Sequence, residues 1–183
     1  MKHSDNRQLL HWLGVFAFLF LFLSVLIFGK SISQPLQARA TDDEFATKAA
    51  SGGMAEVKLG QLAQDKGSSE AVREFGKRMV VDHTKGGEQL AQAAKADGVS
   101  LPQEMNAADR RTYDRLAKLS GDAFDRAYMK TMVEDHQKDI AEFQSEASDS
   151  RHQALQSFAS SSLSTLQDHL RHAREVAANL PKK

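Results

Sequence analysis

Apolar side chains recur at spacings of three and four residues through most of residues 42–179, and this pattern limits the chain to a helical fold. Such spacing places apolar side chains along one stripe of an α-helix. The three prolines, Pro35, Pro102 and Pro181, all lie outside the strongly periodic stretches. No segment alternates with a period of two for long, and β-branched residues are sparse. The sequence therefore predicts an all-α domain.

Breaks at glycine, serine and proline divide this region into four long helices and one short helix. The long helices are expected at about residues 42–66, 69–97, 122–147 and 151–179, and the short one at about residues 106–119. The short breaks within the first pair and within the last pair predict two antiparallel hairpins. The connection of about 24 residues between the pairs is long enough to span a bundle. The expected fold is a four-helix bundle with a long crossover that carries the short helix.

Residues 9–28, LLHWLGVFAFLFLFLSVLIF, form an uncharged apolar run that is long enough to cross a bilayer as a helix. Two interpretations fit this run. It is an uncleaved transmembrane anchor, or it belongs to a secretory signal that is removed after the A-x-A pattern ending at Ala40. Residues 1–40 are thus expected to be an anchor or signal with a linker. The bundle domain, residues 41–183, is expected in the cell envelope: in the periplasm on an inner-membrane anchor, or free there after cleavage.

Composition limits the chemistry and the partners. The chain has no cysteine, so disulfides cannot stabilise an exported domain, and packing or a ligand must do so. The 24 basic and 24 acidic residues are interspersed, without a basic stripe. No nucleic-acid partner is expected. The membrane is the expected partner of residues 9–28 if they are not cleaved, and the sequence identifies no protein partner.

The apolar stripe of each long helix contains one side chain of a type that binds metal ions strongly. These side chains are Glu56, His83, His136 and His169; the first three lie near the middle of their helices, and His169 lies slightly past the middle. Mid-helix residues share one level when the helices of a bundle begin and end together. The four side chains are therefore expected to converge in the core.

Each of these three histidines directly follows an aspartate: Asp82, Asp135 or Asp168. Neighbouring residues on a helix are rotated by about 100°, so the aspartates are expected to face a flank or solvent and to pair with basic residues. A carboxylate one turn away is better placed to orient a histidine. For His136 the candidate is Asp139.

Burying a polar side chain without a partner costs about 1–3 kcal/mol, and a single divalent ion would satisfy all four groups. Three imidazoles and one carboxylate suit zinc, copper or iron better than magnesium or calcium. Such a set completes a tetrahedral site or leaves one position open. Two other arrangements also fit: a metal-free polar cluster in the core, and side chains that are partly exposed.

Three functions are compatible with these residues. The first is a non-enzymatic envelope protein that binds one metal ion, in metal handling or stress tolerance. The second is a metal-free structural or protein-interaction module whose polar core sets the helix register. The third is a redox enzyme with an open metal position. Residues 160–162 are serines without a matching base pattern, so no catalytic residue is assigned.

Gly52, Gly53 and Gly60 interrupt the first long helix, and each costs about 1 kcal/mol relative to alanine. Close approach of a second helix beside Glu56 is the expected reason for them. A poor helix or an early break is the alternative.

Several segments, taken in order, carry a family resemblance: FATKAASGGMAEVKLGQLA, VREFGKRMVVDHTK, LPQEMN, LSGDAFDRAYMKTMVEDHQKDIAEF and LQDHLRHAREVA. Over about residues 43–178 they resemble the bacterial domain-of-unknown-function family 4142, which implies an exported, ferritin-like four-helix bundle and no particular reaction. Ferritin-like di-iron sites use Glu-x-x-His pairs. Here the residues three before the histidines are Val80, Val133 and Leu166. The resemblance therefore implies a mononuclear site or none, rather than a di-iron oxidase or iron store.

Overall fold

The computed structural model describes residues 34–181, and all of the regular secondary structure in them is helical. Five helices follow one another: α2 (Gln34–Lys66), α3 (Glu70–Asp97), α4 (Ala107–Ala117), α5 (Gly121–Asp149) and α6 (Gln153–Asn179). The prediction of an all-α domain is confirmed. The predicted helix ends lie within a few residues of the observed ones, except that α2 begins earlier, at Gln34.

The predicted anchor or signal, residues 9–28, lies outside the described residues. Within residues 34–181, no helix combines the length and the apolar character that crossing a membrane requires. Ala38–Lys183 groups into one compact unit, and this unit is the helical bundle described below.

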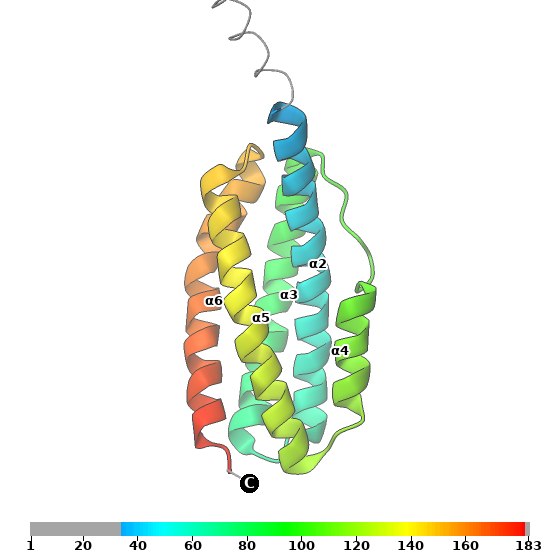
Figure 1. The fold of residues 1–183 in the computed structure, drawn as a ribbon, viewed down its shortest axis with the longest axis vertical. Helices are drawn as coiled ribbons and strands as arrows, with labels where there is room; N and C mark the ends of the chain where they lie inside the picture. The colour runs from blue at the N-terminus through cyan, green and yellow to red at the C-terminus, as the bar shows by residue number, and fades with distance from the viewer. Residues whose placement is uncertain (1–33, 182–183) are drawn as a thin grey trace, which may run out of the picture. The chain divides into compact units, whose positions relative to one another are not determined.

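The four long helices form two antiparallel hairpins (Figure 1). The first consists of α2 and α3, and the second of α5 and α6. Because α3 and α5 run in the same direction, the connection between them passes along the outside of the bundle. The short helix α4 lies on this path beside α2, as expected for a crossover that carries a helix.

Polar contacts at both ends of α4 attach the crossover to α2. At the start of α4, the Asn106 side chain accepts hydrogen bonds from the backbone of the first turn, and the Asn106 N–H donates to Ser51 Oγ over 2.8 Å. At the other end, Lys66 Nζ donates to the carbonyl of Ala117 over 2.5 Å. These contacts fix the crossover against the helix that carries Glu56.

Two aspartates bind the N-termini of helices other than their own, Asp125 from a buried position and Asp97 from a partly buried one. The N–H groups of Ser68 and Ser69 at the start of α3 donate to the carboxylate of Asp125, on α5, over 2.9 and 2.7 Å. At the start of α6, the N–H of Leu155 donates to Asp97 over 2.8 Å. Carboxylates satisfy the free N–H groups and the positive end of a helix, so these two contacts set the level of one helix relative to its neighbours.

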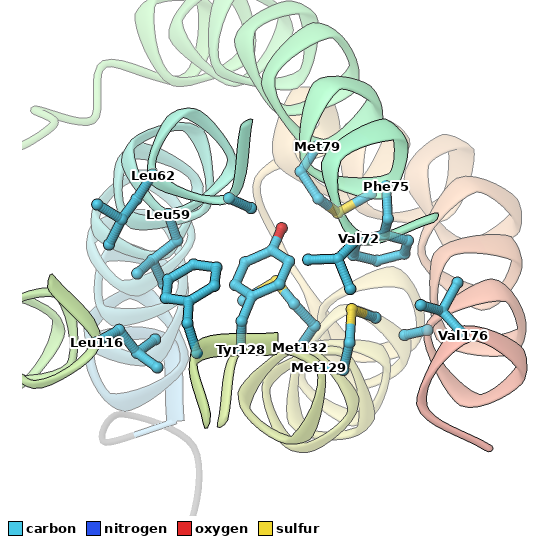
Figure 2. Packing of buried hydrophobic residues seen from close by; sticks show 13 residues of the cluster. Leu59, Leu62, Val72, Phe75, Met79, Leu116, Tyr128, Met129, Met132 and Val176 are labelled. Carbon is cyan, nitrogen blue, oxygen red and sulfur yellow. The ribbon is translucent and has the colours of Figure 1, made fainter. Parts of the chain in front are cut away.

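Two apolar clusters fill the bundle, one towards each end. Figure 2 shows the first, where side chains from α2, α3, α5 and α6 converge around Tyr128 together with Leu116 of α4. The second contains Phe45, Leu90, Leu155 and Phe158. Along each long helix, the predicted site residue lies between its contributions to the two clusters. The polar residues thus occupy a layer between two dry cores.

The helices α2 and α3 cross closely at only part of their length. A Cβ atom on Gly60 would lie 2.6 Å from the carbonyl oxygen of Gly76, so neither position has room for a side chain. The predicted close approach is therefore correct for Gly60. It is wrong for Gly52 and Gly53, where an added Cβ would meet nothing within 4 Å. Those two glycines face open space instead.

Candidate metal site

The structure brings the four predicted side chains together in the middle of the bundle. Each of the four long helices contributes one: Glu56 from α2, His83 from α3, His136 from α5 and His169 from α6. The imidazole centroids lie 5.2–5.6 Å apart. His136 and His169 are fully buried, and Glu56 is only 4% exposed. The predicted convergence at a common depth is observed.

Glu56 lies beside the Nδ1 atoms of two rings, and only its Oε2 has a hydrogen-bond partner. Its Oε2 lies 2.9 Å from His83 Nδ1, and its Oε1 lies 3.4 Å from His136 Nδ1. His136 Nδ1 is also 2.9 Å from the carbonyl oxygen of Met132, one turn earlier in α5. A carbonyl oxygen can only accept, so His136 Nδ1 carries a proton. An ionised Glu56 sets the same tautomer in a neutral His83.

Asp82 holds the third ring from a neighbouring helix. His169 Nε2 donates to Asp82 Oδ2 over 2.8 Å, from α6 to α3. Arg78, one turn before Asp82, fixes the carboxylate through a hydrogen bond of 3.2 Å and also reaches Asp168 on α6 over 2.6 Å. Asp82 and Asp168 pair with a basic residue as predicted. Asp82 is partly exposed, as expected for a flank position, and it also reaches His169 because α6 packs beside α3.

The remaining nitrogens point at one another without hydrogens between them. His136 Nε2 and His169 Nδ1 lie 3.2 Å apart, and neither carries a proton when its ring is neutral and its other nitrogen donates. His83 Nε2 is buried and has no hydrogen-bond partner among the described residues. One nitrogen from each of the three rings lies within 4.8 Å of the others. When all three rings are neutral, each offers a nitrogen lone pair to this small volume.

This geometry matches the dimensions of a tetrahedral metal site. With metal–nitrogen distances of about 2.0–2.1 Å, two ligand nitrogens are about 3.3 Å apart. The His136–His169 pair is already at 3.2 Å, and the His83 nitrogen lies within 4.8 Å of both. Glu56 lies on the Nδ1 side of two rings and is not one of the groups that meet within 4.8 Å. Its role as a direct ligand remains a prediction, whereas its contacts with the rings are observed.

Electrostatics keeps the carboxylate charged and two of the rings neutral. Burial opposes ionisation of Glu56, but the neighbouring His83 and His136 outweigh it and lower the Glu56 pKa to about 2. Burial also lowers the pKa of His136, and lowers that of His169 to about 4. For His83, burial is opposed by Glu56, which raises its pKa overall. Neutral imidazole is the form that binds a metal, so two of the three rings are already in the required state.

Asp139 does not orient His136, although it lies one turn away. No hydrogen bond joins these two side chains in the described residues, and the Met132 carbonyl takes the position at His136 Nδ1. Asp139 lies in a cleft beside Glu56, where burial and the negative charges of Glu56 and Asp135 raise its pKa well above the usual range. The prediction that Asp139 supports His136 was therefore wrong. The carboxylate that orients a histidine is Asp82, which accepts from His169. This partner becomes apparent only from the packing of α3 against α6.

A cleft of about 900 Å³ leads from the surface to this site. It lies between α2, α3 and α6, and its wall also includes Asp139 and Phe143 of α5 and the crossover loop around Pro102. His83 and His169 line it, whereas His136 does not. Two of the three histidines of the site are therefore reached from this cleft.

Comparison with solved structures shows similarity of fold. A DUF305 fragment from Deinococcus radiodurans matches with a TM-score of 0.66 and 14% identity, over 76% of this chain and 97% of that one. A DUF305 protein from Streptomyces coelicolor matches with a TM-score of 0.62 and 13% identity, over 75% of this chain and 92% of that one. At these identities the similarity describes the helical fold alone. No curated protein matches the chain.

The family comparison covers the bundle and the four site residues. A family model described as a domain of unknown function, DUF4142, matches residues 30–176. This range contains most of the chain and confirms the family indicated by the sequence motifs. The chain belongs to the DUF4142 family.

Proposed function

We propose that this protein binds one divalent transition-metal ion through His83, His136 and His169 and serves in metal handling rather than catalysis. One observation carries the proposal. The outer nitrogen of each ring is held by an acceptor, while the inner nitrogens are free and converge. Acceptors on the outer nitrogens set the tautomer and orientation that a metal requires.

The buried layer needs a cation for electrostatic reasons. When both rings are neutral, the two nitrogens at 3.2 Å repel each other, and His83 Nε2 has no hydrogen-bond partner among the described residues. An ion at the centre satisfies all three nitrogens at once. Glu56 and Asp82 contact the outer sides of the rings, and their two negative charges balance a divalent ion. We therefore assign both carboxylates to the support of the ligands.

The ligand set favours a mononuclear site. Imidazole nitrogens suit zinc, copper and iron, whereas magnesium and calcium prefer oxygen ligands. The crossover connectivity is that of a ferritin-like bundle. The residues one turn before the histidines are nevertheless Val80, Val133 and Leu166, which leaves no bridging carboxylates for a second iron. The proposed site holds a single ion.

The proposed location is the cell envelope. The apolar run at residues 9–28 supports export, either as a retained anchor or as a signal removed near Ala40. Metal handling outside the cytoplasm is compatible with a chain that contains no cysteine, because its ligands do not oxidise to disulfides.

Isothermal titration calorimetry of the full-length chain with zinc, copper(II) and iron(II) tests the proposal. We expect one ion per chain for at least one metal, with binding abolished in His136→Ala and in His169→Ala. His152→Ala is the matched control, because His152 lies at the start of α6 near Asp97 and outside the site. Absence of binding by all three metals, or equal loss in the control, contradicts the proposal.

A metal-free polar core is the second candidate, and the Glu56–His83 pair favours it. Their contact of 2.9 Å forms a charged hydrogen bond that needs no ion. One proton between His136 and His169 would relieve the remaining repulsion. In that case nitrogen NMR at neutral pH shows protons on both nitrogens of His136 or His169, and added metal leaves the spectrum unchanged.

A further inference from the structure

The cleft above the candidate metal site has a specific origin in two glycines. Gly52 lies one turn before Glu56 on α2, and Gly86 lies one turn after His83 on α3. Because α2 and α3 are antiparallel, both glycines lie on the same side of the site, at similar levels. A Cβ atom added to either one would meet nothing within 4 Å. The inward-facing sides of α2 and α3 therefore both lack a side chain at this level of the bundle.

The same two helices are in tight contact at the other side of the site. Gly60 and Gly76 leave no room for a Cβ atom, since each would clash with the other's carbonyl oxygen at 2.6–2.7 Å. The helices thus touch at one glycine pair and leave a gap at the other. The gap results from the positions of the glycines in α2 and α3, and it lies next to the three histidines.

The volume and the mainly apolar lining of the cleft are typical of a small-molecule binding site. Its volume of about 900 Å³ lies in the range of ligand pockets, about 300–1,000 Å³, which are mainly apolar with a few polar groups. Val57, Leu90, Phe158 and Leu166 contribute apolar surface, and His83 and His169 lie at its inner end. The volume is far larger than one water molecule needs.

We propose that the bound metal keeps a fourth coordination position facing this cleft, and that the position takes a small molecule with a nitrogen or oxygen donor and an apolar body. The donor replaces a metal-bound water, which leaves through the cleft, and the apolar body lies between α2, α3 and α6. This inference rests on the proposed metal site and adds its ligand class. Three protein nitrogens and one exchangeable ligand complete a tetrahedral set.

Two probes and the cobalt(II)-loaded full-length protein test the proposal. Tetrahedral cobalt(II) absorbs visible light, and the absorption changes when a ligand is exchanged. We expect imidazole and 4-phenylimidazole both to change the spectrum. Burial of the phenyl ring at ~25 cal/mol per Å² predicts at least about tenfold tighter binding of 4-phenylimidazole.

Variants that fill the cleft with a larger side chain distinguish loss of ligand binding from loss of metal binding. Gly86→Leu is expected to retain the cobalt spectrum and to weaken 4-phenylimidazole at least about tenfold, because its side chain occupies the space of the phenyl ring. Gly52→Leu provides the same test from α2, in case one variant folds poorly. Ala96→Leu, on an exposed position of α3 outside the cleft, is the matched control and should leave both affinities unchanged.

The possible outcomes distinguish the two proposals. If cobalt binds and neither probe changes its spectrum, the inference is overturned while the metal site stands. Equal affinity of the two probes, or unchanged 4-phenylimidazole binding in both leucine variants, also overturns the apolar ligand site. If cobalt, zinc, copper and iron all fail to bind, the proposed function falls, and this inference falls with it.

Discussion

His136 Nε2 and His169 Nδ1 lie 3.2 Å apart in the centre of the bundle, although the two residues are 33 positions apart in the sequence. Each ring donates from its other nitrogen, His136 to the Met132 carbonyl and His169 to Asp82. When both rings are neutral, the two facing atoms are therefore both acceptors. This relationship, together with the free nitrogen of His83, makes the layer suited to a cation.

Asp82→Asn should weaken metal binding by about 10–100-fold, the usual effect of removing a carboxylate that orients a ligand. The amide can no longer accept from His169 Nε2 with a full negative charge, and the ion loses one balancing charge. Competition titration with a metal indicator measures the change. Asp168→Asn is the control, because Asp168 also pairs with Arg78 but has no contact with an imidazole. Equal effects of the two variants would contradict the assigned role.

Metal binding should stabilise the folded chain. An ion that binds only the folded state at one hundred times its Kd adds about 2.7 kcal/mol to the free energy of unfolding. Urea denaturation with and without zinc measures this gain, which a chelator should reverse. In His136→Ala the same zinc concentration should have no effect. A gain of the same size in that variant would indicate binding elsewhere.

The glycines of α2 should respond to alanine in opposite directions. Gly60→Ala should destabilise the fold by about 1–3 kcal/mol, because the added Cβ meets the backbone of Gly76. Gly52→Ala should stabilise it by about 0.5–1 kcal/mol, since the position is helical and open. Thermal denaturation of the two single variants measures both effects. Destabilisation of similar size in both would show that α2 and α3 also pack closely at Gly52.

Glu146 should make stability fall as pH rises. Burial, with the nearby charges of Asp42 and Asp97, raises the Glu146 pKa from 4.5 to about 7, and its Oε1 has no hydrogen-bond partner in the described residues. The folded state therefore holds the proton more tightly than the unfolded state. Its contribution is fully present below pH 4.5 and is lost as pH rises through about 7.

Glu146→Gln should accordingly gain stability relative to the natural chain as pH increases from 4.5 to 8. Urea denaturation at several pH values measures the difference. Glu134→Gln, at an exposed position of the same helix, is the control and should show no such trend. A constant difference across this pH range for Glu146→Gln would rule out the proposed titration.

Much of the fold was predictable from local patterns. Apolar spacing identified all five helices, because a helix in a bundle must bury one stripe, and glycine and proline mark where the stripe ends. The same stripes identified Glu56, His83, His136 and His169 as inward residues at one level. That inference succeeded because each site residue lies well inside its helix, between the residues that the helix contributes to the two apolar clusters. It did not depend on any contact between helices.

The partners of the four side chains were decided by the tertiary structure. Whether Asp82 reaches His169 depends on the rotation and separation of α3 and α6, and a single-helix pattern contains neither quantity. The same holds for Asp125, which binds the start of α3 from α5, and for Gly52, which faces a cleft although Gly60 faces a backbone. Periodicity specifies which way a residue points along its own helix. Which atom it meets there depends on how the helices pack against one another.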